Sequence, residues 1–225
     1  MKSTTVVMAL AASTVALPSA YEVKPIDELS SNTPLGTMKW IGPLSPDSNT
    51  TTTLYGTAES IYRQILSLNP SYSPWDFGDF RAEMAAKGIT RDTMEARSNA
   101  KQALQSPNPA AAVLKRDPEW FDCNAGSWVW FEHCNEPLDT MRRLGGGGAQ
   151  CAVEGGKCTR FACAWTCGLY LCSRTGGYVA VECAGIARDA ERISRTCSYW
   201  DFHGLQARGR LVYDHHYSEV TKQDC

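Results

Sequence analysis

All ten cysteines of this 225-residue chain lie in its last part, between Cys123 and Cys225. An even number of cysteines at this density is typical of a small domain that disulfides stabilise in an oxidising compartment. We therefore expect five disulfide bonds, each contributing about 2–5 kcal/mol of stability. The cysteines are Cys123, Cys134, Cys151, Cys158, Cys163, Cys167, Cys172, Cys183, Cys197 and Cys225.

The N-terminus has the pattern of a secretion signal. Lys2 supplies positive charge, residues 6–17 form an apolar run, and Pro18-Ser19-Ala20 provides the small residues of a cleavage site. An apolar run of about a dozen residues is too short to span a bilayer. The sequence thus predicts a signal peptide at residues 1–20, a secreted, extracellular protein, and no membrane-spanning segment in the mature chain.

A dibasic pair, Lys115-Arg116, stands where the cysteine-rich part begins. It resembles the cut sites of kexin-like processing proteases of the fungal secretory pathway. We expect cleavage after Arg116, so that residues 21–116 are a pro-segment removed on maturation and residues 117–225 are the mature domain. Dibasic pairs also occur by chance on solvated surfaces, and that alternative stays open.

The pro-segment is expected to be partly disordered and partly helical. Up to about Thr53 it is rich in Ser, Thr, Pro and Asn, and Asn49 begins a glycosylation sequon there. Apolar residues at helical spacing then predict three short helices: one with Ile61, Ile65 and Leu68, one with Phe77, Phe80 and Met84 that ends at Gly88, and one over 91–105 with Met94 and Leu104. These helices either cover the cysteine-rich domain while it folds or form a passive spacer.

Residues 117–225 predict a disulfide-rich α+β domain. Strands are expected at 127–131, 158–165, 168–173 and within 205–221, the last as one strand or as a hairpin with a turn near Asp214. One helix follows Asn135-Glu136-Pro137 and ends at Gly145, and a second spans 184–196. The order strand-helix-strand-strand-helix-strand predicts a two-layer sandwich, an antiparallel sheet with two helices on one face.

Three motifs follow one another in the mature domain. They are Arg160-Phe161-Ala162-Cys163-Ala164-Trp165 with Gly168-Leu169-Tyr170-Leu171-Cys172, then Cys183, Ile186, Ala187, Ala190, Ile193 and Cys197, and then a closing strand with a terminal cysteine over 205–225. In this order they resemble the small secreted cysteine-rich proteins of fungi, which are candidate effectors. Their layout is similar to that of killer toxins and necrosis-inducing effectors. The resemblance covers the mature domain but not the pro-segment, implies a secreted virulence protein, and carries over no catalytic residue.

Two cysteines depart from that family pattern. Cys134 and Cys167 are additional to the eight cysteines that the resemblance provides. Since two extra cysteines in an oxidised domain most simply pair with each other, we expect a Cys134–Cys167 disulfide. The remaining connectivity stays open, because sequence alone does not determine it.

The histidines are the main candidates for chemistry. His215 and His216 are neighbours, and side chains of neighbouring strand residues diverge, so they do not predict a metal site. A small ribonuclease-like hydrolase using His203, His215 and Glu132, with Arg208 and Arg210 binding phosphate, is one alternative function. The glycine run at 145–148 is expected to be a flexible loop and not a phosphate cradle, because no Lys-Ser/Thr follows it. We expect no catalytic site, no metal and no cofactor.

Exposed aromatic residues point instead to binding. Tyr199 and Trp200, expected in a loop before the last strand, could contact a protein or stack on sugar rings. The formal net charge is −2 and no basic stripe occurs, so nucleic acid is not an expected partner. The sequence predicts a monomeric effector or killer-toxin-like protein that binds an extracellular or cell-surface target. A cell-wall carbohydrate-binding module is a further alternative.

Overall fold

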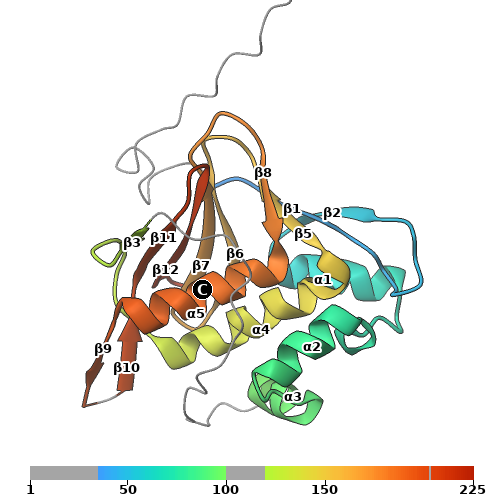
Figure 1. Cartoon of the computed structure of the whole chain (residues 1–225), viewed down its shortest axis with the longest axis horizontal. Coiled ribbons are helices and arrows are strands. Elements are labelled where there is room, and N and C mark those ends of the chain that lie inside the picture. The colour runs from blue at the N-terminus through green and yellow to red at the C-terminus, as the bar shows by residue number, and fades with distance from the viewer. Residues whose placement is uncertain (1–34, 100–119, 203) are drawn as a thin grey trace, which may run out of the picture.

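A computed structural model describes residues 35–99, 120–202 and 204–225. In this part of the chain, five α-helices and twelve strands form antiparallel sheets of five, four and three strands (Figure 1). The predicted α+β class and its disulfide-rich character are confirmed. The predicted signal peptide and the predicted cleavage site at Lys115-Arg116 lie outside the described residues.

The five-stranded sheet is the centre of the cysteine-rich part. Leu169 and Leu171 of its strand β7 face the main core, while Cys172 faces a small cluster on the other side that includes Val212 and Tyr217. This alternation follows from the period of two along a strand. The strand order is β3 (Trp120–Asp122), β11 (Gly209–Val212), β12 (His216–Lys222), β7 (Cys167–Ser173) and β6 (Cys158–Ala164).

Two helices pack against each other and against this sheet, as Figure 1 shows. They are α4 (Asn135–Leu144), which contacts β6 and β7, and α5 (Cys183–Thr196), which contacts β7, β11 and β12. In α5, the predicted stripe of Ile186, Ala190 and Ile193 is buried. Both helices were predicted at nearly these bounds, because their apolar spacing is unambiguous.

The layout of two helices on one face of a single sheet is too simple for the described chain. A second sheet has the order β2 (Thr52–Gly56), β1 (Met38–Gly42), β5 (Gln150–Val153) and β8 (Val179–Glu182). Within it β1 pairs with β5, so the expected pro-segment and the cysteine-rich domain share one sheet. The stretch before Thr53, expected to be disordered, therefore contains an ordered strand with Met38 and Trp40 fully buried.

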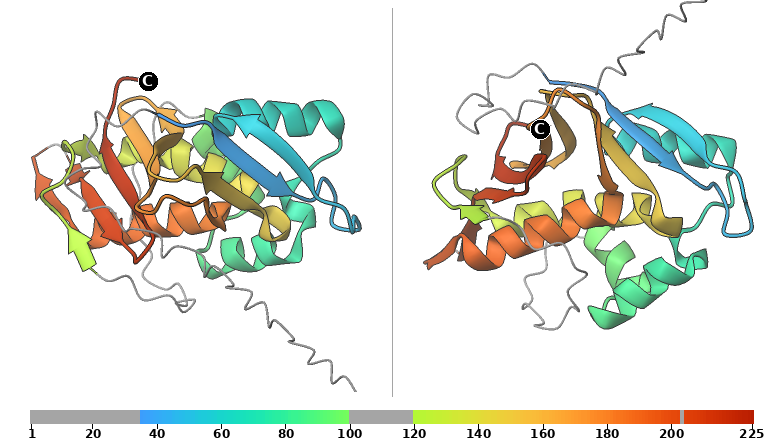
Figure 2. Two further views of the ribbon diagram at one scale, coloured as in Figure 1. Left: turned by 90° about the horizontal axis from the view of Figure 1, so that it is seen from above. Right: turned by 45° about the horizontal axis from the view of Figure 1, so that its top comes forward.

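Residues 35–99, called the first segment from here on, also contain three helices, which lie on the same side of the molecule as β1 and β2 (Figure 1). They are α1 (Ala58–Leu68), α2 (Gly78–Ala86) and α3 (Arg91–Asn99), and their positions confirm the three predicted helices. Ile61, Ile65, Phe80, Met84 and Met94 are buried as expected, but Leu68 is exposed and Leu104 lies outside the described residues. Both views in Figure 2 place β1 and β2 at the end of the molecule opposite to β9 and β10.

A third sheet forms the far end of the cysteine-rich part. Its order is β4 (Val129–Trp130), β10 (Gly204–Ala207) and β9 (Ser198–Asp201). The first predicted strand is thus shorter than expected, and the loop expected from Ser198 is mostly strand β9. The predicted hairpin near Asp214 is confirmed as the β11–β12 connection.

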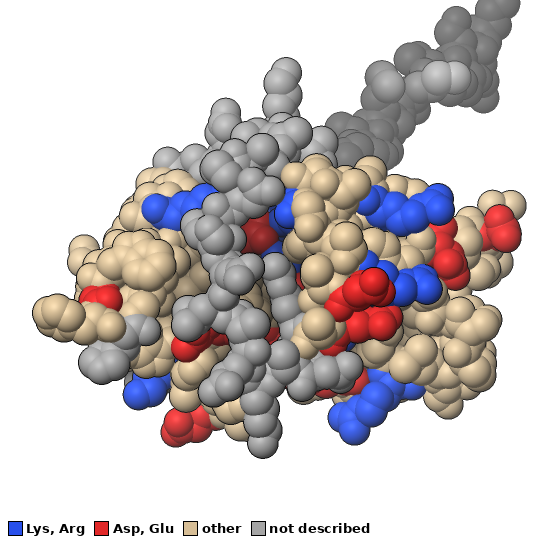
Figure 3. Space-filling model, turned by 90° about the horizontal axis from the view of Figure 1, so that it is seen from below, with Lys and Arg blue, Asp and Glu red and all other residues tan. Residues whose placement is uncertain are grey.

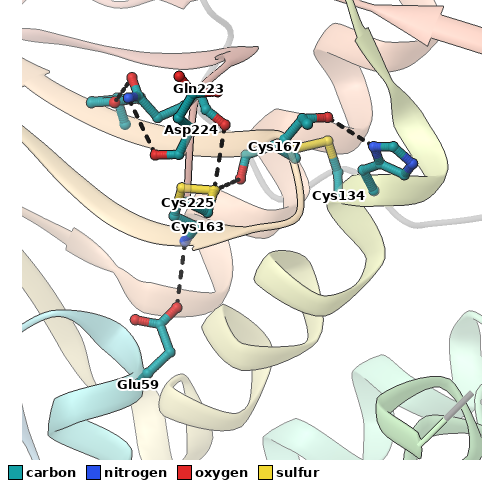
Figure 4. The surroundings of a disulfide bond; sticks show 10 residues. Glu59, Cys134, Cys163, Cys167, Gln223, Asp224 and Cys225 are labelled. Carbon is teal, nitrogen blue, oxygen red and sulfur yellow. Dashed lines mark hydrogen bonds between the residues drawn. A yellow bond between two sulfur atoms is a disulfide. The ribbon is translucent and has the colours of Figure 1, made fainter. Parts of the chain in front are cut away.

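Five disulfides link these elements, and all ten cysteines are paired. The predicted Cys134–Cys167 pair is confirmed, and it joins the start of α4 to the start of β7. Figure 4 shows it near the Cys163–Cys225 pair, which fixes the C-terminus to β6. The other pairs are Cys123–Cys197, Cys151–Cys183 and Cys158–Cys172.

We predict that the double variant Cys134→Ser/Cys167→Ser loses about 2–5 kcal/mol of unfolding free energy, because its unfolded chain is less constrained. Urea unfolding monitored by circular dichroism measures this loss. Replacing both cysteines together avoids a free thiol that could exchange with the four remaining bonds. An unfolding free energy equal to that of the unaltered protein would contradict this account of the bond.

Candidate interaction site

The two most exposed large apolar side chains among the described residues lie together after α5. Trp200 of β9 is 69 % exposed, and Phe202, in the turn between β9 and β10, is fully exposed. The hairpin lies at one end of the molecule, away from the four-stranded sheet (Figure 1). Large apolar side chains displayed in this way commonly mark interaction sites.

The base of this hairpin is held firmly in place. Cys197, directly before β9, is bonded to Cys123. Arg208, directly after β10, donates from Nε to the carbonyl oxygen of Cys123 at 3.1 Å, and its backbone N–H donates to the carbonyl of Cys197 at 3.2 Å. Gln206 Nε2 of β10 donates to Asp201 Oδ2 of β9 at 2.7 Å. The exposed turn therefore projects from a preorganised support.

Tyr199 and Trp200 have different surroundings, because neighbouring side chains on a strand point to opposite faces. The Tyr199 ring packs edge-on against Trp128, with ring centroids 4.6 Å apart. The Arg208 guanidinium lies 4.5 Å from the centre of the Trp128 ring, in the range of a cation–π contact. Tyr199 is thus partly a packing residue, whereas Trp200 is available to a partner.

The sequence identified two of the three exposed aromatics of this hairpin. Tyr199 and Trp200 were expected to be accessible, and both are. Phe202 was missed, although the run Tyr199-Trp200-Asp201-Phe202 contains three aromatics directly before a glycine-containing turn. That combination of an aromatic cluster and a turn residue was the available signal.

The candidate hydrolase residues are not assembled into one site. Glu132 lies in a short 3-10 turn near the start of β7. Its neighbour His133 has Nδ1 2.8 Å from Oγ1 of Thr166, the residue just before β7 begins. His215 lies at the other end of β7, where its carbonyl accepts from the backbone N–H of Arg174. The length of β7 separates the two positions by roughly 20 Å at ~3.3 Å per residue. His203 lies outside the described residues.

The proposed phosphate ligands are also engaged elsewhere. Arg208 stacks on Trp128, and Arg210 Nε donates to Glu219 Oε2 at 2.8 Å while lying over Tyr217. His216 is buried and stacks on Tyr213, with ring centroids 4.5 Å apart. These contacts give both arginines and His216 structural roles.

One partly buried carboxylate lies between α5 and the β11–β12 hairpin. Asp189 of α5 accepts hydrogen bonds from the hydroxyls of Tyr213 and Ser218, each at 2.6 Å. Burial raises the pKa of Asp189 above its ordinary value, while the two hydrogen bonds favour the ionised form. Burial, followed by the neighbouring Asp189 charge, raises the pKa of Tyr213 as well. The two hydrogen bonds of the Asp189 carboxylate thus link α5 to the β11–β12 hairpin.

The charges of the described residues do not gather by sign on the face seen in Figure 3. Acidic and basic side chains are interspersed there, with no continuous basic strip among the coloured atoms. Nor does any group of three His, Cys, Asp or Glu side chains within the described ranges have the arrangement of a metal site. No helix in these ranges combines the length and hydropathy that a membrane crossing requires.

Comparison with known proteins adds no relative: no family model, curated protein or solved structure matches this chain. The arrangement of side chains on the β9–β10 hairpin is therefore the main guide to function.

We predict that the exposed aromatics contribute little to folding. The unfolding free energy of the Trp200→Ala/Phe202→Ala variant should lie within about 0.5 kcal/mol of that of the unaltered protein, since neither side chain is buried. Trp128→Ala should cost at least about 1 kcal/mol, because it removes the contacts with Tyr199 and Arg208. Urea unfolding of the two variants tests this contrast, and equal losses would contradict it.

Proposed function

We propose that the protein is a secreted, disulfide-stabilised effector or killer-toxin-like protein that binds an extracellular or cell-surface target through its β9–β10 hairpin. The observation that carries this proposal is the exposure of Trp200 and Phe202 on a hairpin that the Cys123–Cys197 bond and Arg208 hold in place. A preorganised aromatic pair loses little conformational entropy when a partner covers it.

The chemistry of the hairpin favours a target with an apolar pocket. Aromatic anchors contribute most when they enter a desolvated cavity surrounded by polar contacts. Asp201 lies between Trp200 and Phe202 in the sequence and bonds to Gln206, so it places a polar group on the opposite face of the same hairpin. A protein surface on another cell offers both features.

A carbohydrate target is a second candidate, because the same aromatics could stack on sugar rings. The two kinds of target make different demands on the aromatic side chain. Stacking on a sugar needs one flat, open face of the aromatic ring, whereas a protein pocket encloses the whole side chain. Binding to insoluble chitin or β-glucan would support this candidate and move the target from a protein to the cell wall.

Secretion and processing belong to the same proposal. Five disulfides suit an oxidising, protease-rich exterior. Asn49, in the loop between β1 and β2, is exposed, which is compatible with a glycan at its sequon. We propose cleavage after Arg116 as the maturation cut.

The test is a binding measurement on whole cells. Fluorescently labelled protein is titrated onto plant protoplasts and onto intact cells of competing fungi and bacteria, and bound fluorescence is recorded against concentration. We expect saturable binding to one cell class, weakened about thirtyfold or more in Trp200→Ala/Phe202→Ala, since even one hot-spot truncation costs on the order of 2 kcal/mol.

The matched control is Tyr178→Ala, which removes an exposed aromatic outside the hairpin. Its binding should equal that of the unaltered protein. The proposal fails if no cell class binds the protein saturably, or if the hairpin variant and the control bind equally well.

A further inference from the structure

The expected pro-segment is bound to the cysteine-rich domain through contacts that do not depend on the chain between them. Residues 35–99 contain no cysteine, so none of the disulfides can hold them. After a cut at Arg116, only non-covalent contacts would keep the two parts together. Those contacts therefore decide whether cleavage releases the segment.

The first contact is a continuous sheet. β1 pairs with β5 in antiparallel register, with Trp40 opposite Cys151. Without β1, the edge of β5 would be left without its hydrogen-bonding partner, a state that proteins usually avoid. The fully buried Trp40 also donates from Nε1 to the carbonyl oxygen of Leu144 at 2.9 Å, at the end of α4.

The second contact is apolar and extensive. Ile61, Ile65, Met84 and Met94 are fully shielded from solvent and belong to the same core as Leu138, Met141 and Leu144 of α4. Helices α1 and α3 both contact α4. Removing residues 35–99 would expose this side of α4 to water, because the five-stranded sheet and α5 cover only the other side.

The third contact explains the glycine run after α4. It forms a tight turn in which Gly147 and Gly148 both have φ of +67°, and their backbone N–H groups donate to the two carboxylate oxygens of Asp79 at 3.1 and 2.8 Å. A Cβ added at Gly147 would lie 2.6 Å from Pro43 and 2.9 Å from Phe77. This turn is therefore shaped to receive the first segment, and its amides bind that segment's own carboxylate.

The fourth contact is a partly buried ion network that crosses between the parts. Lys87 Nζ lies 2.5 Å from Glu191 Oε2, and Arg188 lies 2.9 Å from Glu83. Glu191 also pairs with Arg142, which is buried and bonded to Asp139. Burial alone would raise the pKa of Glu191, but Arg142 and Lys87 outweigh it and hold that pKa below its ordinary value. Glu191 is thus held as an anion between two cations, one from each part.

A hydrogen bond near the C-terminus adds to these contacts. The Glu59 carboxylate of α1 accepts from the backbone N–H of Cys163 at 3.4 Å, beside the Cys163–Cys225 disulfide (Figure 4). The first segment therefore touches β5, α4, the glycine turn, α5 and β6.

We propose that residues 35–99 stay bound after the chain is cut between residues 99 and 120, so that processing yields a two-chain protein rather than a free cysteine-rich domain.

The test uses the full secreted chain with a sequence-specific protease site placed within residues 100–119, and the cut is made after folding. Denaturing mass spectrometry should then show two chains, while native mass spectrometry and size-exclusion chromatography should show one 1:1 complex. The readout is a mass and not an activity, so it is independent of the target proposed above. Separate elution of the first segment at micromolar concentration would overturn the inference.

A matched pair of variants tests whether the described interface is responsible. Asp79→Ala, which loses both bonds to the glycine turn, should speed release of the cut segment about tenfold or more, since hydrogen bonds to a charged group are among the strong ones. Asp92→Ala changes an exposed acidic residue in the first turn of α3 and should release at the unaltered rate. Circular dichroism of the uncut variants checks that both are folded, and equal release rates would refute the role of the glycine turn.

The naturally secreted protein provides the last check. Its denaturing mass spectrum should contain the chain Asp117–Cys225, lighter by ten hydrogens for five disulfides, together with a first chain in equal amount. A secreted product that consists of the cysteine-rich chain alone would contradict the two-chain form, whatever the behaviour of the protein cut in vitro.

Discussion

The burial of α4 on nearly all sides is the feature on which the rest of the structure depends. The five-stranded sheet and α5 cover one side of this helix, and the first segment covers the other. Its two ends are held as well, by the Cys134–Cys167 bond before it and by Trp40 and the glycine turn after it. A ten-residue helix with two charged residues in its core is stable here because each charge has a partner.

This arrangement assigns different tasks to covalent and non-covalent contacts. The disulfides compensate for the small core of the cysteine-rich part, and all of them lie within it. The first segment is held by strand pairing, apolar burial and charge pairing instead. At one end of the molecule, the first segment packs against the cysteine-rich part. At the opposite end, formed by β9 and β10 (Figure 2), Trp200 and Phe202 are exposed to solvent.

Local patterns in the sequence were sufficient for some of these features. The stripe from Ile186 to Ile193 predicted α5, and the departure of two cysteines from a family pattern predicted the Cys134–Cys167 bond. Strand β1 does not follow from local pattern, because its five residues lie in a Ser/Thr/Pro-rich stretch. All five pair with nearby β2, and three of them also pair with β5, about a hundred positions away, which joins this hairpin to the rest of the molecule. The β-propensity of individual residues carries little information about a strand that depends on pairing with a distant part of the chain.

The same limit applies to the candidate sites. Exposure of Tyr199 and Trp200 could be expected from their place beside a turn, but their support by Arg208 and Trp128 depends on the folded chain. The glycine run looked like a flexible loop because its partner, Asp79, lies more than sixty residues earlier. Likewise, Lys87 and Glu191 are unremarkable surface types until α2 and α5 are brought together.

Hydrogen–deuterium exchange on the cut, two-chain protein tests most directly whether the first segment and the cysteine-rich domain form one core. Amides of β1 and of its partner strand β5 should exchange as slowly as those of β7, because opening the β1–β5 pair would require the shared core to open. Fast exchange in β1 and β5 beside a protected β7 would contradict the account, since it would show that the first segment is not part of that core.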